Sequence, residues 1–452
     1  MPIINEQQVR EASSFNARLN ETLEPAFRQY KQSLSLDDLL EEIQRISELP
    51  LEEATTLPKE AFLSDEFFAW EVENVFRPGW MCVAHISQLP EKGDFINVEL
   101  FGEPLIVIRD KADEVHVLSR VCPHRGMDIM PPGFGHDGHG PAEFRQGGKD
   151  RGHTRVLLCP YHSWTFDLDG QLKACPEMRN ARGFQRCEWG LHEFRSEVWN
   201  GFVFVNLDRS AESSVAEQYA KMNAEIEPWN LGEMEVVFES HWEIPCNWKV
   251  LTENFMESYH HSGTHIRTLQ TLMPARGTWN EAEEPYHIRC HLPYGKRTRA
   301  KIIETEARGE QWDAFPTIPG LSDEKRHEWG LYLGYPLFTF VTAPDQAVWY
   351  RIEPVSSSLV RLMTTVMVPK STIEHPDYEA MYERGVKEAV DFHLEDMEVL
   401  SAVQRSMTAD GYQRGRLSHL EMSVWLIQRF LAARARGTWP TFDRPGAPSQ
   451  RS

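Results

Sequence analysis

The sequence lacks the features that direct a chain into or across a membrane. Its first fifteen residues, MPIINEQQVREASSF, contain no basic region followed by an apolar run, which is the pattern of a secretory signal peptide. No stretch approaches the roughly 18–20 uninterrupted apolar residues that a membrane-spanning helix needs. We therefore expect a cytoplasmic protein without a membrane partner.

The chain also has comparatively few basic residues. It holds 47 Lys and Arg against 68 Asp and Glu, which gives a formal net charge of −21. A surface this acidic repels phosphate backbones, so a nucleic acid partner is not expected. The charge could suit a basic protein partner such as an electron donor, although solubility alone also explains it.

Cysteine is scarce for a disulfide-bonded protein. An odd number of cysteines in a large cytosolic chain argues against a disulfide framework and directs attention to metal ligation. The seven cysteines are Cys82, Cys122, Cys159, Cys175, Cys187, Cys246 and Cys290.

The pattern along the 452 residues predicts an α+β protein in three parts. Residues 1–60 form a polar N-terminal helical arm, with apolar residues at helical spacing and Ser35 as a candidate N-cap. Residues 61–207 contain short β-branched runs separated by Gly and Asp turns, which is typical of a small antiparallel β domain. Residues 208–452 alternate helices with strands and form the third part.

One segment inside the predicted β domain has no period. Residues 131–155 are rich in Gly, His and charge, which predicts a long exposed loop. Its three histidines, His136, His139 and His153, are explained more simply as solvated side chains than as a metal site, because the loop offers no cysteine.

Two Cys-His pairs lie in this β domain. Cys122-Pro-His124 is followed, after 34 intervening residues, by Cys159-Pro-Tyr-His162, and each pair falls at a turn between predicted strands. Zinc takes tetrahedral nitrogen and sulfur ligands, so a zinc site is one interpretation. The other is a Rieske [2Fe–2S] cluster, in which two cysteines hold one iron and two histidines hold the other.

A second set of histidines lies about 100 residues further along. His260 and His265 are five residues apart, so on an unbroken helix they would point in different directions, and a break near Ser262-Gly263 is expected. Two histidines and a carboxylate around one point, with other positions open, make the facial triad of non-haem Fe(II) oxygenases. The carboxylate must come from elsewhere in the chain.

These motifs resemble the Rieske non-haem iron oxygenases, the family of aromatic-ring-hydroxylating α subunits. The resemblance spans roughly residues 57–435 and includes CPHRG at 122–126, CPYHSW at 159–164 and ENFMESYH at 253–260. It implies a Rieske cluster on Cys122, His124, Cys159 and His162, and a catalytic domain with an antiparallel sheet flanked by helices, of the helix-grip or START-like type.

The resemblance also assigns the mononuclear iron site. It implies that His260 and His265 bind the iron, and that Asp396 is the third ligand, with Glu395 as the alternative. Glu257, three residues before the first histidine, becomes the catalytic carboxylate that links the two metals. His261 falls outside the pattern and is expected to be an orienting or surface histidine.

The activity implied is that of a terminal oxygenase component, which uses O₂ and electrons from a ferredoxin or NAD(P)H-dependent reductase. A glutamate at position 257 resembles the branch of the family whose members form α-only homotrimers. This resemblance favours hydroxylation or oxidative demethylation of a small aromatic or methylated amine substrate. The alternatives are a cis-dihydroxylating dioxygenase, with which a β subunit is possible, and a Rieske electron-transfer protein without oxygenase activity. Five residues are candidates for the substrate pocket but are more simply explained as core: Leu331, Tyr332, Phe338, Phe340 and Trp349.

Overall fold

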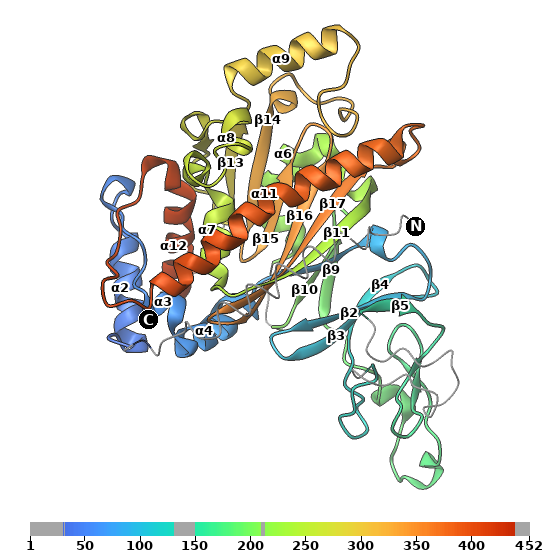
Figure 1. Ribbon diagram of the computed structural model, residues 1–452. Coiled ribbons are helices and arrows are strands. Elements are labelled where there is room, and N and C mark those ends of the chain that lie inside the picture. Colours follow the sequence, from blue (N-terminus) through green and yellow to red (C-terminus); the bar gives the residue numbers. More distant parts are fainter. Residues whose placement is uncertain (1–29, 31, 131–149, 209–212, 439–452) are drawn as a thin grey trace, which may run out of the picture. The chain divides into compact units, whose positions relative to one another are not determined.

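The structure is a computed structural model of the 452-residue chain, and it describes residues 30, 32–130, 150–208 and 213–438. The chain divides into two compact units, one of residues 77–217 and one that combines residues 1–76 with residues 218–452. Of the predicted loop 131–155, residues 131–149, with His136 and His139, lie outside the described residues. Figure 1 shows the elements of both units in sequence colours.

The unit of residues 77–217 is built from three small antiparallel sheets. Their strand orders are β1-β10-β9, β4-β3-β2-β5 and β6-β7-β8. The strands are β1 Met81–His85, β2 Asp94–Leu100, β3 Glu103–Arg109, β4 Val115–Ser119, β5 Arg151–His153, β6 Leu157–Leu158, β7 Thr165–Phe166, β8 Leu172–Ala174, β9 Arg195–Trp199 and β10 Phe202–Asn206. The hairpin between β7 and β8 turns at Gly170, whose φ of 83° favours glycine.

Two features of this unit differ from the sequence prediction. His153 was expected in a loop, but it lies in β5, which pairs with β2, and its ring is 3.0 Å from an Asp94 carboxylate oxygen. Residues 61–76, predicted within the β domain, are helical and cluster with the other unit. One of the helices there is α4, Asp65–Glu71, and it is capped by Ser64, whose side chain accepts the Phe67 amide.

The larger unit is organised around one seven-stranded antiparallel sheet, in the order β11-β17-β16-β15-β14-β13-β12. Its strands are β11 Met234–Ile244, β12 Trp279–Asn280, β13 His287–Pro293, β14 Glu328–Gly334, β15 Phe338–Thr342, β16 Ala347–Ser356 and β17 Leu359–Pro369. Its two long neighbouring strands β16 and β17 pair from Ala347 with Met367 to Ser356 with Leu359.

Helices flank this sheet, and the α+β prediction is confirmed. The main helices of the unit are α2 Leu36–Ser47, α3 Glu60–Leu63, α4 Asp65–Glu71, α6 Ala220–Ile226, α7 Trp248–Met256, α8 Leu269–Leu272, α9 Lys296–Ala307, α10 Lys370–Ile373, α11 Tyr378–Ser406 and α12 Met422–Ala435. In Figure 1 the long helix α11 runs across the strands β15, β16 and β17. Ser35 caps α2 as predicted, in a capping box with Asp38.

The N-terminal helices are joined to α7 by a buried ion pair. The Nζ atom of Lys249 lies 2.6 Å from Glu71 Oε1, and both side chains are fully buried. The indole of Trp248 donates to the other Glu71 oxygen at 3.1 Å. Removal of one partner would leave an uncompensated buried charge, so this pair fixes α7 against α4.

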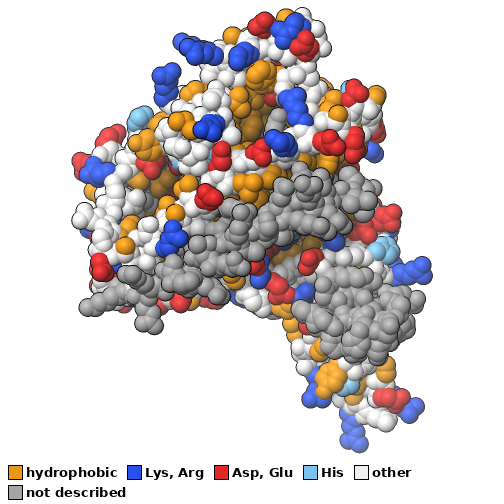
Figure 2. All heavy atoms as spheres, viewed as in Figure 1, with side chains coloured by type: hydrophobic (Ala, Val, Ile, Leu, Met, Phe, Trp, Pro, Cys, Tyr) orange, Lys and Arg blue, Asp and Glu red, His pale blue; other side chains and the backbone are white. Residues whose placement is uncertain are grey.

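The net negative charge is not gathered into one patch on the face shown in Figure 2. Acidic and basic side chains are interspersed over the described surface visible there, with apolar side chains between them. Among the described residues, no helix is long and apolar enough to cross a membrane.

Candidate metal centres

Two short loops of the smaller unit hold the paired cysteines and histidines. Cys122 and His124 lie in the loop after β4, and Cys159 and His162 lie in the loop between β6 and β7. Both cysteines are buried, and the rings of the two histidines are adjacent, with centroids 4.7 Å apart. The four residues that the sequence paired by spacing therefore come together in space.

The two loops close in the same way. The Gly126 amide donates to the Cys122 carbonyl at 3.0 Å, and the Ser163 amide donates to the Cys159 carbonyl at 3.1 Å. Gly126 and Ser163 both have positive φ, 72° and 60°, which turns each loop back on itself. Equivalent tight loops thus present one thiol and one imidazole each.

The chemistry of this set fits a [2Fe–2S] cluster. Interaction with the Cys122 side chain lowers the pKa of the Cys159 thiol to about 6, as expected where two cysteine side chains face one another. The Nδ1 atom of His162 is buried without a partner among the described residues. Adjacent sulfurs on one side and adjacent imidazoles on the other match two cysteines on one iron and two histidines on its neighbour.

A zinc site fits these loops less well. Zinc bonds of about 2.0–2.3 Å require all four donor atoms to lie close together. The described residues contain two groups of three donors whose ligand atoms lie within 4.8 Å of one another, and neither group includes Cys122 or Cys159. One of the two groups, Asp110, Glu114 and His116, is a partly exposed turn with internal ion pairs.

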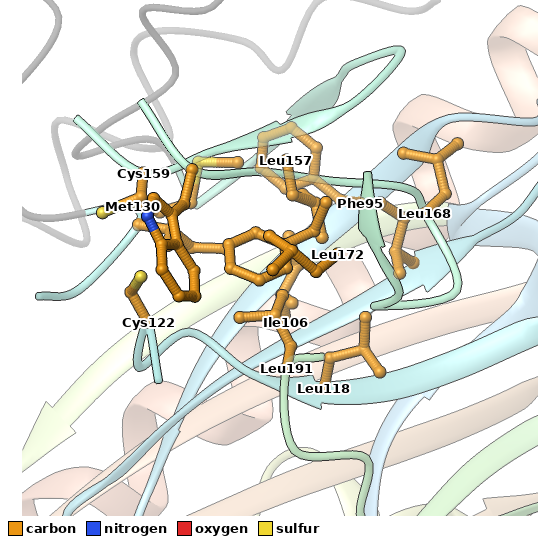
Figure 3. Packing of buried hydrophobic residues seen from close by; sticks show 14 residues of the cluster. Phe95, Ile106, Leu118, Cys122, Met130, Leu157, Cys159, Leu168, Leu172 and Leu191 are labelled. Carbon is orange, nitrogen blue, oxygen red and sulfur yellow. The ribbon is translucent and has the colours of Figure 1, made fainter. Parts of the chain in front are cut away.

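A packed apolar core holds the cysteine loops. Figure 3 shows Cys122 and Cys159 at one end of this cluster, with the leucines and Phe95 filling the other end. The ring of Trp164 stacks on the His124 imidazole, with centroids 4.7 Å apart and planes 9° apart. The core therefore fixes the cysteines, while stacking orients one of the histidines.

The second site begins where helix α7 ends. The side chain of Glu257 accepts the backbone amides of Tyr259 and His260, the latter at 3.2 Å. A side chain that bonds nearby amides in this way competes with helix continuation. The break therefore falls at Glu257, earlier than the expected position near residues 262–263, and a short 3₁₀ turn follows it.

The same carboxylate orients the first histidine. Glu257 Oε1 lies 2.6 Å from His260 Nδ1, so the opposite ring nitrogen, Nε2, is left to point toward Asp396 Oδ1 at 3.6 Å. Glu257 is 8% exposed. One side chain thus both ends the helix and aims the imidazole.

A second carboxylate orients the other histidine. Glu395 Oε2 lies 2.7 Å from His265 Nδ1 and also accepts the Thr268 hydroxyl at 2.7 Å. His265 Nε2 then faces Asp396 Oδ1 at 3.0 Å. Between the two acids of α11, Asp396 is therefore the one that joins the histidines, and Glu395 lies behind His265.

His260, His265 and Asp396 form the second of the two close donor groups. His265 and Asp396 are buried, and the Asn254 side chain donates to Asp396 Oδ1 at 3.0 Å. Two imidazoles and one carboxylate around a single point match the donor set of a mononuclear non-haem iron. Each imidazole is also backed by a carboxylate, as is usual for metal-binding histidines.

α7 and α11 are locked together beneath this group. Gln404 of α11 accepts the Asn247 amide at the start of α7 at 3.0 Å. Its amide nitrogen donates to the carbonyls of Phe62 and Ser357, each at 3.3 Å. All three polar contacts are buried, so the spacing of the two helices that carry the donors is fixed.

A cavity of about 50 Å³ opens beside the three donors. That is only a few times the roughly 10–15 Å³ that one water needs, so the cavity suits a compact group. Its lining residues are Asn254, Phe255, Met256, Glu257, His260, His261, His265, Leu269, Leu292, Trp329, Leu331, Thr339, Phe340, Val341, Tyr350, Phe392 and Asp396.

The cavity revises part of the sequence interpretation. Of the five pocket candidates, Leu331 and Phe340 line the cavity, and the other three do not. His261 is not at the surface: it is 3% exposed, and burial lowers its pKa to about 3, so its ring is neutral. Sequence reasoning gave no role to Asn254, although it lies inside the ENF motif.

Comparison with known proteins also assigns the two sets of candidate ligands to two different domains. Residues 79–191 match the Rieske [2Fe-2S] domain model, and residues 231–437 match the model of the ring hydroxylating alpha subunit, catalytic domain. The chain belongs to the Rieske non-haem iron oxygenases. It is an oxygenase subunit that carries a Rieske [2Fe–2S] cluster and a mononuclear iron. It takes electrons from a reductase or ferredoxin partner and uses O₂ on a small substrate.

Two relatives are similar over most of the chain. The carnitine monooxygenase oxygenase subunit of Acinetobacter pittii is 26% identical over 80% of this chain and 88% of its own. The glycine betaine monooxygenase oxygenase subunit of Pseudomonas aeruginosa is 23% identical over 85% of this chain and 91% of its own.

Two solved structures share the fold. The quaternary ammonium Rieske monooxygenase CntA, in complex with L-carnitine, has a TM-score of 0.64 at 21% identity, over 90% of this chain and all of its own. Naphthalene 1,2-dioxygenase from Rhodococcus sp. has a TM-score of 0.69 at 18% identity, over the same shares.

Proposed function

We propose that this oxygenase subunit hydroxylates or oxidatively demethylates a small methylated amine. The observation that carries the proposal is the compact cavity of about 50 Å³ beside His260, His265 and Asp396. Its wall includes the aromatic residues Phe255, Trp329, Tyr350 and Phe392. Aromatic faces attract ammonium and methylammonium groups through cation–π interactions. Both relatives compared above are monooxygenase subunits named for carnitine and glycine betaine.

We assign the metal ligands from donor chemistry and geometry together. Cys122, His124, Cys159 and His162 would hold the cluster. His260, His265 and Asp396 would hold the iron, through the two Nε2 atoms and a carboxylate oxygen. When bound, the cluster supplies electrons and the iron activates O₂.

The role of the protein's own groups is positioning. Glu257 and Glu395 accept from Nδ1 of His260 and His265 and so turn both Nε2 atoms toward Asp396, where a metal would take the place of their protons. The Asn254 amide donates to Asp396 and restricts the rotation of that carboxylate. The apolar part of the cavity wall keeps bulk water from the reacting group.

Glu257 would also receive a hydrogen bond from a cluster histidine of a neighbouring subunit. One of its oxygens is engaged by His260 Nδ1, and the other accepts two backbone amides. A carboxylate offers about four acceptor positions, so a further donor can be accommodated. This role requires a ring-shaped homotrimer, which we propose without a β subunit.

A second candidate function is cis-dihydroxylation in the catabolism of an aromatic compound. It is favoured by the biphenyl dioxygenase α subunit of Metapseudomonas furukawaii, which is 27% identical over 52% of this chain and 50% of its own. The two relatives that are similar over most of the chain favour the amine instead, because both are monooxygenase subunits. A Rieske electron-transfer protein would have no use for a donor group such as His260, His265 and Asp396.

A substrate screen separates these functions. Iron-loaded protein, a generic reductase and NADH are incubated with methylated amines, phenols and aromatic carboxylates, and products are scored by mass and by formaldehyde release. Formaldehyde and a product that has lost one methyl group are expected from an amine. A cis-diol from an aromatic compound, with no amine oxidised, would contradict the proposal and establish the second function.

A further inference from the structure

Two buried hydroxyl groups lie on the cavity wall, on neighbouring strands. Thr339 of β15 is the direct register partner of Tyr350 of β16, and both residues line the cavity. Residues directly opposite in an antiparallel pair project to the same face, with Cβ atoms roughly 4.5–5.5 Å apart. Each residue therefore presents a hydroxyl to the cavity, with the phenol oxygen of Tyr350 further from the sheet than Thr339 Oγ1.

Neither hydroxyl has a protein partner within the described ranges. Thr339 is 2% exposed and its Oγ1 atom has no hydrogen bond. Tyr350 is 4% exposed, and its ring contacts Phe255 and His393, but no described residue bonds its hydroxyl. Unpartnered buried hydroxyls are unfavourable and uncommon in native proteins. A ligand in the cavity can supply a partner to Thr339 and to Tyr350, because both residues line it.

The charged residues around the cavity restrict the chemical class of ligand that can bond these two hydroxyls. No lysine or arginine is among the lining residues. A substrate carboxylate placed here would be desolvated without a side-chain cation to compensate it. Burial and the nearby Asp396 charge raise the pKa of the Tyr350 phenol, so it stays protonated and can donate. An uncharged oxygen acceptor fits two hydroxyl donors without requiring a counter-ion.

We propose that Thr339 and Tyr350 bind an uncharged oxygen of the substrate, a hydroxyl, carbonyl or ether, and thereby position its methylated nitrogen beside His260, His265 and Asp396. This inference rests on the proposed amine oxidation. It predicts a substrate that has an uncharged oxygen in place of a carboxylate. The substrate would therefore differ from carnitine and glycine betaine, after which the two relatives are named.

The same sheet supplies matched controls. Thr342 and Tyr332 also carry buried hydroxyls without partners. They belong to one part of the sheet, because Thr342 pairs with Gly330, two residues before Tyr332. Neither Thr342 nor Tyr332 lines the cavity. Thr339→Val and Tyr350→Phe can therefore be compared with Thr342→Val and Tyr332→Phe.

The experiment uses three amines of nearly equal size with the iron-loaded holoenzyme and reductase. N,N-dimethylethanolamine carries a hydroxyl, N,N-dimethylpropylamine a methyl group and N,N-dimethylglycine a carboxylate at the corresponding end. Wild type should prefer the alcohol in kcat/KM. Thr339→Val and Tyr350→Phe should each raise KM for the alcohol about 3–10-fold, with a smaller change in kcat and unchanged iron content. The control variants should keep the wild-type preference.

Three results would overturn the inference while leaving amine oxidation intact. They are equal kcat/KM for the alcohol and the propylamine in wild type, a preference for the carboxylate, or the same loss in the control variants as in the cavity variants. If iron-loaded wild type oxidises none of the three amines, the proposed function fails and the inference fails with it.

Discussion

The two adjacent acids of α11 permit a sharp test of how the iron site is built. Asp396 lies 3.0 Å from His265 Nε2, whereas Glu395 lies 2.7 Å from Nδ1 of the same ring. The Asp396 side chain is 5% exposed and that of Glu395 is 33% exposed. Asp396→Ala should therefore remove an iron ligand, while Glu395→Ala should remove only the group that orients a ligand.

The expected magnitudes differ accordingly. Loss of a carboxylate behind a ligating histidine costs about 10–100-fold in metal affinity or activity, or about 1.4–2.7 kcal/mol. Glu395 also accepts the Thr268 hydroxyl, so its removal frees both His265 and Thr268, which places the expected loss toward the upper end of that range. Asp396→Ala should leave no stoichiometric iron at any concentration at which wild type is saturated.

Anaerobic Fe(II) titration against a competing chelator measures both effects. Visible absorption of the cluster serves as the internal control, since it should be the same in all variants. Glu398→Ala, an exposed acid on the same helix, is the matched control and should bind iron as wild type does. Loss of iron in Glu395→Ala together with retention in Asp396→Ala would refute the assignment and make Glu395 the ligand.

Four further outcomes are expected. Glu257→Gln should keep both metals yet nearly abolish turnover, since an amide presents one acceptor oxygen in place of two; wild-type turnover would contradict its role. Cys122→Ser should lose the visible absorption and EPR signal of the cluster while iron binding persists, and an intact signal would remove this ligand. Lys249→Met should lower the free energy of unfolding in urea by about 3–5 kcal/mol, because Glu71 is left buried and unpaired, and replacing both partners by apolar residues should restore much of it. Burial raises the pKa of Glu253 from 4.5 to about 8, so between these two pH values its carboxyl group is protonated in the folded chain and ionised in the unfolded chain. The free energy of unfolding should therefore fall as the pH rises from 4.5 to about 8. Glu253→Gln should flatten that decline in urea unfolding measured at pH 5 to 8, and an unchanged slope would show that Glu253 is ionised in the folded state.

Local spacing determined the identity of most of the donor residues. Cys122 and His124 are two residues apart, and Cys159 and His162 are three apart, so each pair must share one loop in any fold. The same holds for Glu257 and His260, whose side chains bond directly in the structure. Capping also acts over a few residues, which is why α2 begins directly after Ser35, as predicted.

Contacts between distant segments decided the rest. Asp396 is 131 residues from His265, and no local rule chooses between it and Glu395. Neighbouring residues on a helix point about 100° apart, so the orientation of α11 alone decides which acid reaches the histidines. The pairing of β15 with β16 likewise brings Thr339 and Tyr350 to one cavity, which Thr342 does not line. The sequence by itself determined which chemical groups are present and how they are paired locally. Only the tertiary structure decided which of them share one small space, because packing between segments far apart in the chain sets the face that each presents.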